Sequence, residues 1–403
     1  MQLPWLKLEE ATDILWKLAE VGLTTLQTGG NSVRTVNACP LAGVCPKETF
    51  DVTPYAMALD SRFLGDDSVM HLPRKFKSAF SGCSADCNYS RIQDFGAIAQ
   101  VRQENGALRR GFQVFVGGGL GVFPRLAEPL EEFVPAEEIL ATCEAVIRVF
   151  DRLGNRQDKQ KARLKFVLQR LGIEEIRRLV REELEAMHSP QEELPSVAPT
   201  DGATPPSTAR SGADPSTVEG QPDYQRWRRW NVHDQSQEGL HTVIIPLRLG
   251  DITASQMELV ADLADRHAGG ALRSSLQQDL VLRHVPQADL PAVYETLSSS
   301  DLTGIRASGI ADVTSCPGTT ACSLAITTSK GLANQLVQML EKPDYQDDEA
   351  LGSLRIKVSG CPDACGQHYL ADIGLFGCAV HVSGRLYPAY QLLLGGAVTE
   401  EGT

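Results

Sequence analysis

Two stretches of the chain, TSCPGTTAC (residues 314–322) and SGCPDACG (residues 359–366), carry four cysteines in two close pairs. The first pair has the form C-x5-C and the second the form C-x3-C. Both forms also occur earlier, in NACPLAGVC (residues 37–45) and SGCSADC (residues 81–87). Cys39 and Cys316 are 277 residues apart, and Cys83 and Cys361 are 278 residues apart. The sequence therefore predicts an internal repeat of two homologous halves, related by a pseudo-twofold axis.

The sequence between these cysteines predicts the same elements in both halves. Apolar residues recur at helical spacing from Leu8 to Leu18, before the first cysteine loop, and again from Leu290 to Leu297. A second helix is expected after each C-x5-C loop, and a strand is expected to lead into each C-x3-C loop. Further strands are predicted at residues 112–116 and 242–247.

The stretch between the halves has the composition of a linker. Residues 189–223 contain seven prolines, many small polar residues and no aromatic residue. Such a sequence buries too little apolar surface to offset the entropy of ordering, which predicts a flexible linker at residues 188–223.

The repeat also predicts that the chain lacks pieces at both ends. With the offset of 277, Gln278 corresponds to Met1, so residues 224–277 have no first-half counterpart. The second half stops near the counterpart of Gly117, whereas the first half continues with helical sequence to Met187. The alternative is that the two halves evolved asymmetrically.

Composition limits the class of protein and its partners. The chain has 403 residues, 42% of them hydrophobic and 22% charged, and a formal net charge of -13. This composition predicts a multi-domain globular protein that binds neither nucleic acid nor membrane and lies in the cytoplasm. The basic aromatic stretch RWRRW (residues 226–230) is interpreted as a solvated edge with two buried rings.

Ten cysteines are too few for a disulfide scaffold in a chain of this length, so their spacing favours metal binding or catalysis. Four thiolates in two close pairs suit a 4Fe-4S cluster. A zinc site is the weaker alternative, because structural zinc sites favour shorter spacing within each pair. Cys143 and Cys378 lie outside both sets and are predicted to be buried thiols.

Together, these motifs resemble the signature of the sirohaem and 4Fe-4S sulfite and nitrite reductase haemoproteins. The resemblance extends to NSVRTVNACP (residues 31–40), LPRKFK (residues 72–77) and GGGLG (residues 117–121). It implies a 4Fe-4S cluster with four thiolate ligands and a sirohaem whose iron is bridged to the cluster by Cys365. The implied cluster ligands are Cys316, Cys322, Cys361 and Cys365.

The same resemblance implies roles in the first half. Arg34, Lys75 and Lys77 resemble the residues that bind the substrate anion and supply protons. Arg74 resembles a ligand of the sirohaem carboxylates, and Arg273 is a second candidate for this role. Close backbone approach to the sirohaem is expected at Gly117, Gly118 and Gly119. The first cysteine set (Cys39, Cys45, Cys83 and Cys87) is interpreted as relics or structural thiols, with a second iron–sulfur cluster as the alternative.

The implied fold class is α+β, with two pseudo-twofold-related haem-binding halves and ferredoxin-like parts. Residues 1–187 are expected to form the first half, which covers the distal haem face. Residues 224–310 are expected to form the ferredoxin-like part of the second half. Residues 311–403 are expected to bind the 4Fe-4S cluster and the sirohaem.

The implied reaction is the six-electron reduction of sulfite to sulfide, with electrons supplied by ferredoxin or a flavoprotein. Lys77 favours sulfite, because nitrite enzymes of the family commonly have Asn at this position. Reduction of nitrite to ammonia by the same cofactors is the first alternative. An inactive remnant that binds only a cluster is the second.

Overall fold

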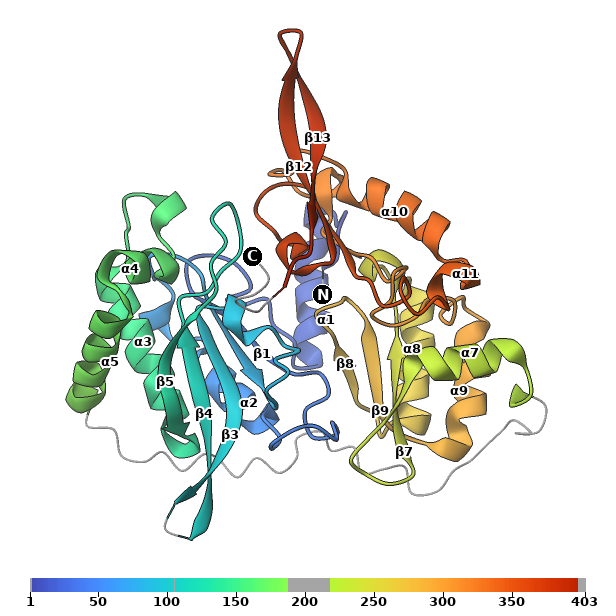
Figure 1. Ribbon diagram of the computed structural model, residues 1–403, viewed down its shortest axis with the longest axis horizontal. Coiled ribbons are helices and arrows are strands. Elements are labelled where there is room, and N and C mark those ends of the chain that lie inside the picture. Colours follow the sequence, from blue (N-terminus) through green and yellow to red (C-terminus); the bar gives the residue numbers. More distant parts are fainter. Residues whose placement is uncertain (1, 105, 188–217, 398–403) are drawn as a thin grey trace. The chain divides into compact units, whose positions relative to one another are not determined.

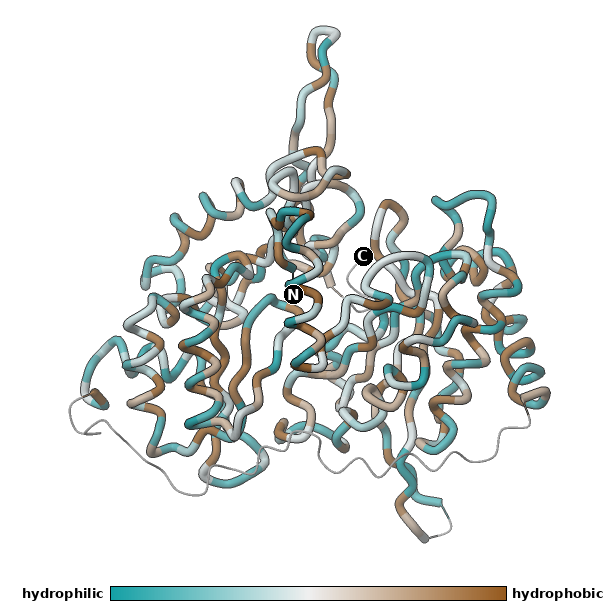
Figure 2. The backbone as a smooth tube through the Cα atoms, turned by 180° about the vertical axis from the view of Figure 1, so that it is seen from behind, coloured by the Kyte–Doolittle hydropathy of each residue, from teal (hydrophilic) through white to brown (hydrophobic). Residues whose placement is uncertain are grey.

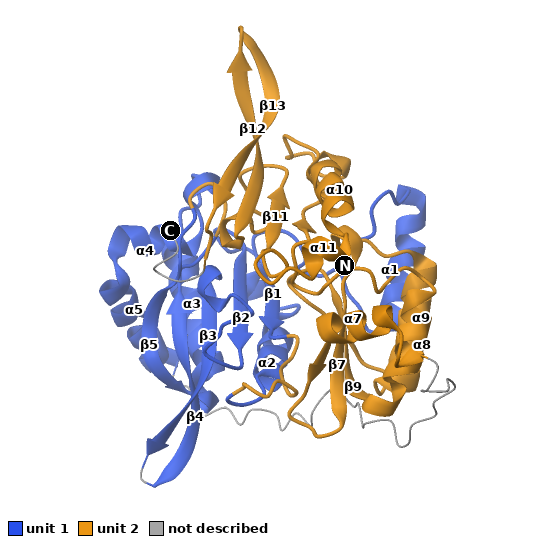
Figure 3. Cartoon of the chain, turned by 45° about the vertical axis from the view of Figure 1, so that its right-hand side comes forward, with its two compact units in different colours: residues 1–39, 49–119, 124–197 blue, residues 40–48, 120–123, 198–403 orange. Residues whose placement is uncertain are grey.

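A computed structural model describes residues 2–104, 106–187 and 218–397. The chain forms two compact units, coloured separately in Figure 3. Unit 1 comprises residues 1–39, 49–119 and 124–197, and unit 2 comprises residues 40–48, 120–123 and 198–403. Of the predicted linker, residues 188–217 lie outside the described part; Val218 is buried, and a helix begins at Pro222.

Unit 1 is built on a mixed five-stranded sheet with the order β1-β2-β3-β4-β5 (Figure 1). The strands are β1 (Val33–Ala38), β2 (Phe76–Ser81), β3 (Phe95–Glu104), β4 (Ala107–Val116) and β5 (Glu128–Pro135). The first three run parallel and the last two are antiparallel to their neighbours. The helices are α1 (Ala11–Glu20), α2 (Thr53–Phe63), α3 (Ile139–Leu153), α4 (Leu164–Leu171) and α5 (Ile173–Met187). Phe112 lies in the core, where its ring contacts those of Phe50, Tyr55 and Phe80.

Unit 2 contains two four-stranded sheets. The first has the order β6-β7-β9-β8, from β6 (Val232–Asp234), β7 (Leu240–Ile245), β9 (Leu280–Pro286) and β8 (Leu272–Ser274), and all its pairs are antiparallel. It packs with α7 (Pro222–Asn231), α8 (Ala254–His267) and α9 (Leu290–Ser298) around one apolar core. Unit 2 is therefore an α+β assembly, like unit 1.

The second sheet of unit 2 has the order β10-β11-β12-β13. Its strands are β10 (Thr314–Ser315), β11 (Ile356–Ser359), β12 (Ile373–Val382) and β13 (Arg385–Leu394), accompanied by α10 (Ser329–Leu340) and α11 (Pro343–Gln346). The hairpin of β12 and β13 extends beyond the body of its unit and carries both polar and apolar residues (Figure 2).

The predicted repeat is confirmed by the register of these sheets. In unit 1, Asn37 pairs with Ala79 between parallel strands β1 and β2. In unit 2, the equivalent pair is Thr314 with Lys357, between parallel strands β10 and β11. The next strands keep the same offset, since Ser78 pairs with Phe95 and Ile356 pairs with Ile373. The α+β fold class is likewise confirmed.

The helices that precede the two cysteine loops differ in their packing. The second-half helix, α9, buries Leu290, Val293 and Leu297 completely. The first-half helix, α1, has no buried residue, and Trp16 on its surface is 69% exposed. Both helices were predicted from apolar spacing, which indicates a helix but does not reveal whether its apolar side is covered.

Several predictions about individual side chains can be compared with the structure. Trp227 and Trp230 are buried, as expected for the basic aromatic stretch. Cys143 is buried, but Cys378 is only partly buried, so that part of the prediction was wrong. Cys378 lies on β12 of the projecting hairpin, where few neighbours cover it. Among the described residues, no helix is long and apolar enough to cross a membrane.

Trp227 is expected to contribute strongly to the stability of unit 2. Its ring centroid lies 5.9 Å from that of Tyr224 and 5.3 Å from that of Tyr294. Truncation to alanine leaves a cavity, so Trp227→Ala should lower the free energy of unfolding by about 3–5 kcal/mol. Urea unfolding measures this loss. The control, Trp16→Ala on exposed α1, should change stability by less than about 0.5 kcal/mol; equal losses in the two variants would contradict the expectation.

Candidate cofactor site

The first cysteine loop of unit 2 is held in place around Cys316. The Cys316 amide donates to the carbonyl of Val358 on β11 at 3.2 Å, which continues the β10–β11 ladder. The Gln278 side chain clamps the preceding residue, because its amide both donates to and accepts from the Ser315 main chain at 3.1 Å. The Ser329 hydroxyl donates to the Cys316 carbonyl at 2.7 Å. The main chain at Ser315 and Cys316 is therefore held by three separate parts of unit 2.

The second cysteine loop contacts the first through main-chain and sulfur atoms. The amide of Gly360 donates to Sγ of Cys316 at 3.1 Å. The Gly360 carbonyl accepts from the amides of Ile326 and Thr327 at 2.8 and 3.1 Å. A Cβ at Gly360 would lie 2.8 Å from Cα of Gly318, so the two loops pack too closely for any other residue there. This contact brings the Cys316 and Cys361 loops together.

The electrostatics of Cys361 indicate that three thiols lie near one another. Burial raises the pKa of Cys361, and the nearby Asp363, Cys365 and Cys316 raise it further against one backbone hydrogen bond. Neighbouring thiolates repel one another, and a bound cationic iron centre removes that penalty. Soft sulfur donors and backbone N–H groups directed at sulfur suit a 4Fe-4S cluster.

Within the described ranges, no three metal-ligating side chains converge on a single ion. In a 4Fe-4S cluster each thiolate binds a different iron atom, so the four sulfurs lie further apart than the ligands of one ion. The roles of all four predicted ligands, Cys322 included, stay predictions.

The first cysteine set folds in the same way as the second. The Cys39 amide donates to Phe80 O at 3.1 Å, matching the bond from Cys316 to Val358. Tyr89 and its counterpart Gln367 both have a left-handed backbone conformation, with φ of 52° and 59°. In this set, however, Sγ of Cys39 lies 3.4 Å from Sγ of Cys87. A contact of this kind is expected of structural thiols, and the choice between that interpretation and a second cluster stays a prediction.

Unit 1 gathers basic side chains around Asp94, which is fully buried. The Arg163 guanidinium donates to both carboxylate oxygens of Asp94, at 3.2 and 2.5 Å. The Lys77 amide donates to the same carboxylate at 3.1 Å. The Lys165 ammonium donates to Gly119 O at 3.3 Å. We call the following residues the basic group: Arg34, Arg74, Lys75, Arg163 and Lys165.

The members of the basic group lower one another's affinity for protons. Burial lowers the pKa of Arg34, and the charges of Arg74 and Arg163 lower it further. Burial also lowers the pKa of Lys165 to about 8, with a further contribution from Arg163. Cations that destabilise one another in this way form a site that favours a bound anion.

The structure brings Arg34, Arg74 and Lys75 into this basic group and places Lys77 beside Asp94. Phe76 is completely buried between two partly buried lysines, as expected for alternation along a strand. Arg163 and Lys165 were missed by the sequence analysis. Two basic residues separated by one residue are common at the first turn of a helix, so the sequence contained no signal for a site. Only the fold brings Arg163 and Lys165 next to Asp94.

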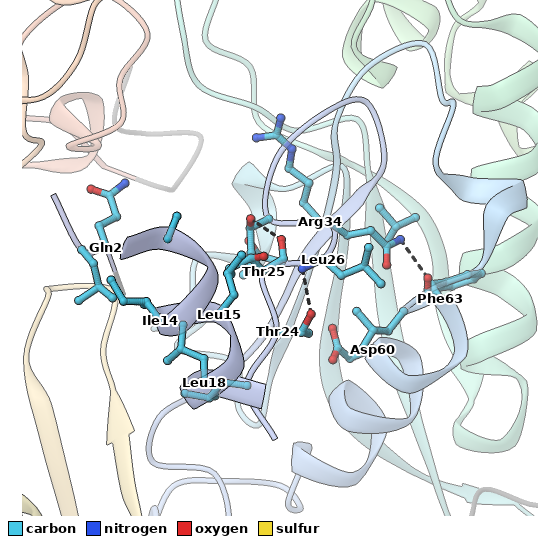
Figure 4. A pocket seen from close by; sticks show the side chains of 18 of the residues that line it. Gln2, Ile14, Leu15, Leu18, Thr24, Thr25, Leu26, Arg34, Asp60 and Phe63 are labelled. Atoms are coloured by element: carbon cyan, nitrogen blue, oxygen red, sulfur yellow. Dashed lines mark hydrogen bonds between the residues drawn. The ribbon is translucent and has the colours of Figure 1, made fainter. Parts of the chain in front are cut away.

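A pocket of about 880 Å³ adjoins Arg34 in unit 1 (Figure 4). Leucines and isoleucine of α1 form one wall, and Leu26, Asp60 and Phe63 form another. The Nε and Nη2 atoms of Arg34 donate to Gly30 O at 3.0 and 2.5 Å, which fixes one edge of the guanidinium. The side chain extends away from the leucines, so its charge is not directed into the apolar wall.

Protein packing accounts for the glycines at residues 117–119. A Cβ at Gly117 would lie 2.6 Å from the Leu168 side chain, and one at Gly118 would lie 2.6 Å from Arg91 O. A Cβ at Gly119 would approach the Arg163 guanidinium at 2.9 Å. The backbone contact at Gly118 and the φ of +78° at Gly117 require glycine, whereas the Arg163 side chain beside Gly119 can move. The predicted sirohaem contact stays a separate prediction. Arg273 binds the carbonyls of Pro40 and Ala42, at 3.2 and 3.0 Å, which are protein partners for that candidate.

Two copies of one α+β arrangement, with four thiols on paired loops of the second copy, define a class of iron–sulfur protein built by internal repetition. Comparison with known families makes this class specific. The chain belongs to the nitrite and sulphite reductase 4Fe-4S domain family, which matches residues 29–187 and 306–402. The nitrite/sulfite reductase ferredoxin-like half domain matches residues 233–300. The cofactors of this family are a 4Fe-4S cluster and sirohaem. The resemblance inferred from the cysteine motifs is confirmed.

Curated relatives include enzymes named for either anion. The chain is 30% identical to the assimilatory ferredoxin-dependent nitrite reductase of Haloferax mediterranei, covering 100% of this chain and 66% of that protein. It is 30% identical to the ferredoxin–nitrite reductase of Synechococcus elongatus, covering 99% of this chain and 72% of that protein. It is 27% identical to the sulfite reductase [ferredoxin] 1 of Mycolicibacterium paratuberculosis, covering 100% and 67%. The chain therefore spans about two thirds of the length of these relatives.

A solved structure supports the fold. The Mycobacterium tuberculosis NirA protein matches with a TM-score of 0.78 at 27% identity, covering 98% of this chain and 67% of that one.

Proposed function

We propose that the chain reduces sulfite to sulfide in a six-electron reaction, as part of a sirohaem and 4Fe-4S enzyme. The observation that carries this proposal is the pair of cysteine loops at Cys316 and Cys361, joined by the bond from Gly360 to sulfur. The proposed ligands are Cys316, Cys322, Cys361 and Cys365. When bound, the cluster and the sirohaem supply electron transfer and the iron that the anion binds.

The chain's own side chains are proposed to handle the anion and its protons. Arg34 offers a planar fork for two oxygen atoms, with one edge fixed by Gly30. Lys75 and Lys77 add compact charges, which donate protons as oxygen leaves sulfur as water. Arg163 and Lys165 extend the positive field around them, and Arg74 is proposed to bind sirohaem carboxylates.

The anaerobic absorption spectrum of the purified chain tests the cofactors directly. Sirohaem, an isolated iron–sulfur cluster and zinc differ in the visible range, because only the first two absorb there and with different bands. A cluster without sirohaem would favour the inactive remnant. A colourless zinc protein would refute the proposal.

The proposed donor is ferredoxin, because the curated relatives of both kinds carry ferredoxin in their names. A flavoprotein donor is the alternative. Reduction kinetics with each reduced donor would separate them.

The preference for sulfite over nitrite is proposed to depend on Lys77. A second cation at this position suits the more highly charged sulfite, so Lys77→Asn should shift the ratio of kcat/KM towards nitrite by roughly tenfold. Steady-state assays with a chemical electron donor and each anion measure the ratio. The control is Lys17→Asn on exposed α1, which removes the same charge elsewhere in unit 1. An unchanged ratio in Lys77→Asn would leave Lys77 without a role in the choice between the two anions.

A further inference from the structure

Lys357 is a buried lysine that joins the two cysteine loops of unit 2. It lies on β11 and is 1% exposed. Its ammonium donates to Oγ1 of Thr314 and to Oε1 of Gln367, both at 3.2 Å. Thr314 stands two residues before Cys316, and Gln367 stands two residues after Cys365. One ammonium group thus holds the start of one cysteine loop and the end of the other.

Two buried carboxyl groups from other parts of unit 2 interact electrostatically with Lys357. Asp279, immediately before β9, is 2% exposed, and Asp312, before β10, is 8% exposed. Asp279 accepts from the Ser275 hydroxyl at 3.1 Å, and Asp312 accepts from the Ser308 amide at 2.7 Å. Both carboxylates favour the charged form of Lys357 through space. We call Lys357, Asp279 and Asp312 the buried triad.

The first half of the repeat serves as an internal control for the triad. The position of Lys357 on the paired strand is occupied by Ala79, which is completely buried. The first-half loops keep the same main-chain hydrogen bonds and the same left-handed residues with this alanine. The repeated loop therefore folds without a buried lysine, although its own second cysteine loop contains buried Asp86, whose carboxylate accepts from Ser81 and Ser90. Because burying a cation is unfavourable, the presence of Lys357 at this position in the second half points to a task specific to the second cysteine set.

The buried triad changes its charge in the neutral pH range. Burial lowers the pKa of Lys357 to about 8, partly opposed by the charge of Asp312. Burial raises the pKa of Asp279 to about 6 and raises the pKa of Asp312 well above its usual value.

Other charged groups near the triad are balanced or neutral. Arg355, beside Lys357, is paired with Asp372 at 3.1 Å. His368, whose Nδ1 lies 2.8 Å from the Ser359 hydroxyl, is neutral because burial lowers its pKa to about 4. The triad is therefore the part of this region whose charge responds to pH.

We propose that Lys357 is a positioning residue for the 4Fe-4S cluster, and that the buried triad takes up a proton from the solvent when the cluster accepts an electron. The inference rests on the proposed function, since it needs a cluster on Cys316, Cys322, Cys361 and Cys365. One electron from the reduced donor and one proton from an acid in the solvent would enter together: the proton forms an N–H bond on neutral Nζ of Lys357 or an O–H bond on the carboxylate of Asp279, and the solvent acid is left as its conjugate base. The added positive charge offsets the added negative charge, which favours the reduced cluster.

The reduction potential of the cluster, followed by electron paramagnetic resonance in a redox titration, tests this coupling. In the unmodified protein the potential should fall as pH rises from 6 to 9, because the triad loses protons over this range. In Lys357→Met the potential should be more negative and the fall with pH should be smaller. The control Lys330→Met removes a partly exposed lysine of unit 2 that pairs with Asp251, and should keep the original profile.

Lys357→Arg provides a second test if Lys357→Met fails to hold the cluster. Arginine stays charged at every pH used, so the potential of this variant should remain high above pH 8, where that of the unmodified protein falls. A profile identical to that of the unmodified protein would overturn the inference. So would a full cluster in Lys357→Met with an unchanged potential.

Iron and acid-labile sulfide separate this inference from the proposed function. A purified chain without a cluster would refute both. If the chain held a full cluster whose reduction potential changed neither with pH nor on substitution of Lys357, the inference alone would be refuted.

Discussion

Replacing Cys361 with serine is expected to remove the iron–sulfur cluster completely. A serine hydroxyl is a poor ligand for iron compared with a thiolate, and a cluster held by three ligands is exposed to loss. The iron of the cluster and the acid-labile sulfide should both be lost in Cys361→Ser, and the absorption bands of the cluster should disappear. A full complement of both in this variant would show that Cys361 is not a ligand.

Two cysteine variants make this result specific. Cys378→Ser changes a partly buried thiol on β12, outside both sets, and should keep all the iron. Cys83→Ser changes the repeat counterpart of Cys361, whose set includes the contact between Cys39 and Cys87. It should also keep all the iron if the first set is structural. Loss of half of the iron in Cys83→Ser would instead indicate a second cluster.

Replacing Arg34 with alanine is expected to lower kcat/KM for the anion on the order of a hundredfold or more. Arg34 is fixed by Gly30 and carries a charge that Arg74 and Arg163 destabilise, so a bound anion relieves that repulsion. Loss of one well-placed donor to a developing negative charge has an effect of this size. Steady-state kinetics with a chemical electron donor measure it.

The matched control for Arg34 is Arg62→Ala. Arg62 lies on α2 of the same unit and pairs with Glu144. The Arg62→Ala substitution therefore removes an arginine without changing the basic group. The kcat/KM of Arg34→Lys should lie between those of Arg34→Ala and Arg62→Ala, because lysine keeps the charge but lacks the planar guanidinium. If Arg34→Ala and Arg62→Ala behaved alike, Arg34 would have no part in anion binding.

The spacing of the cysteines predicted a large share of the fold. Offsets of 277 at Cys39 and 278 at Cys83 required closely similar elements between them, and the sheets confirm this with matched registers. The apolar spacing from Leu290 to Leu297 predicted a helix that is present as α9. Local patterns succeed here because each element is defined by residues close together in the chain.

Other parts of the site depend on contacts between distant residues, which local patterns do not contain. Arg163 meets Asp94 across 69 residues, and Lys357 meets Thr314 across 43. In the sequence, Lys357 is one more basic residue in a short apolar strand. Only the fold shows that it is buried and which groups surround it, since burial is a property of the packed structure.

The matched cysteine loops are the mark of a gene duplication in which one copy kept the backbone and changed its side chains. Ala79 and Lys357 stand at the same place in the two copies, and so do Cys83 and Cys361. A single polypeptide thus contains two versions of one loop, at Cys83 and at Cys361, of which only the second is proposed to bind the cluster. Exchanging side chains between the two loops would separate the residues that the loop needs in order to fold from those that it needs in order to transfer electrons.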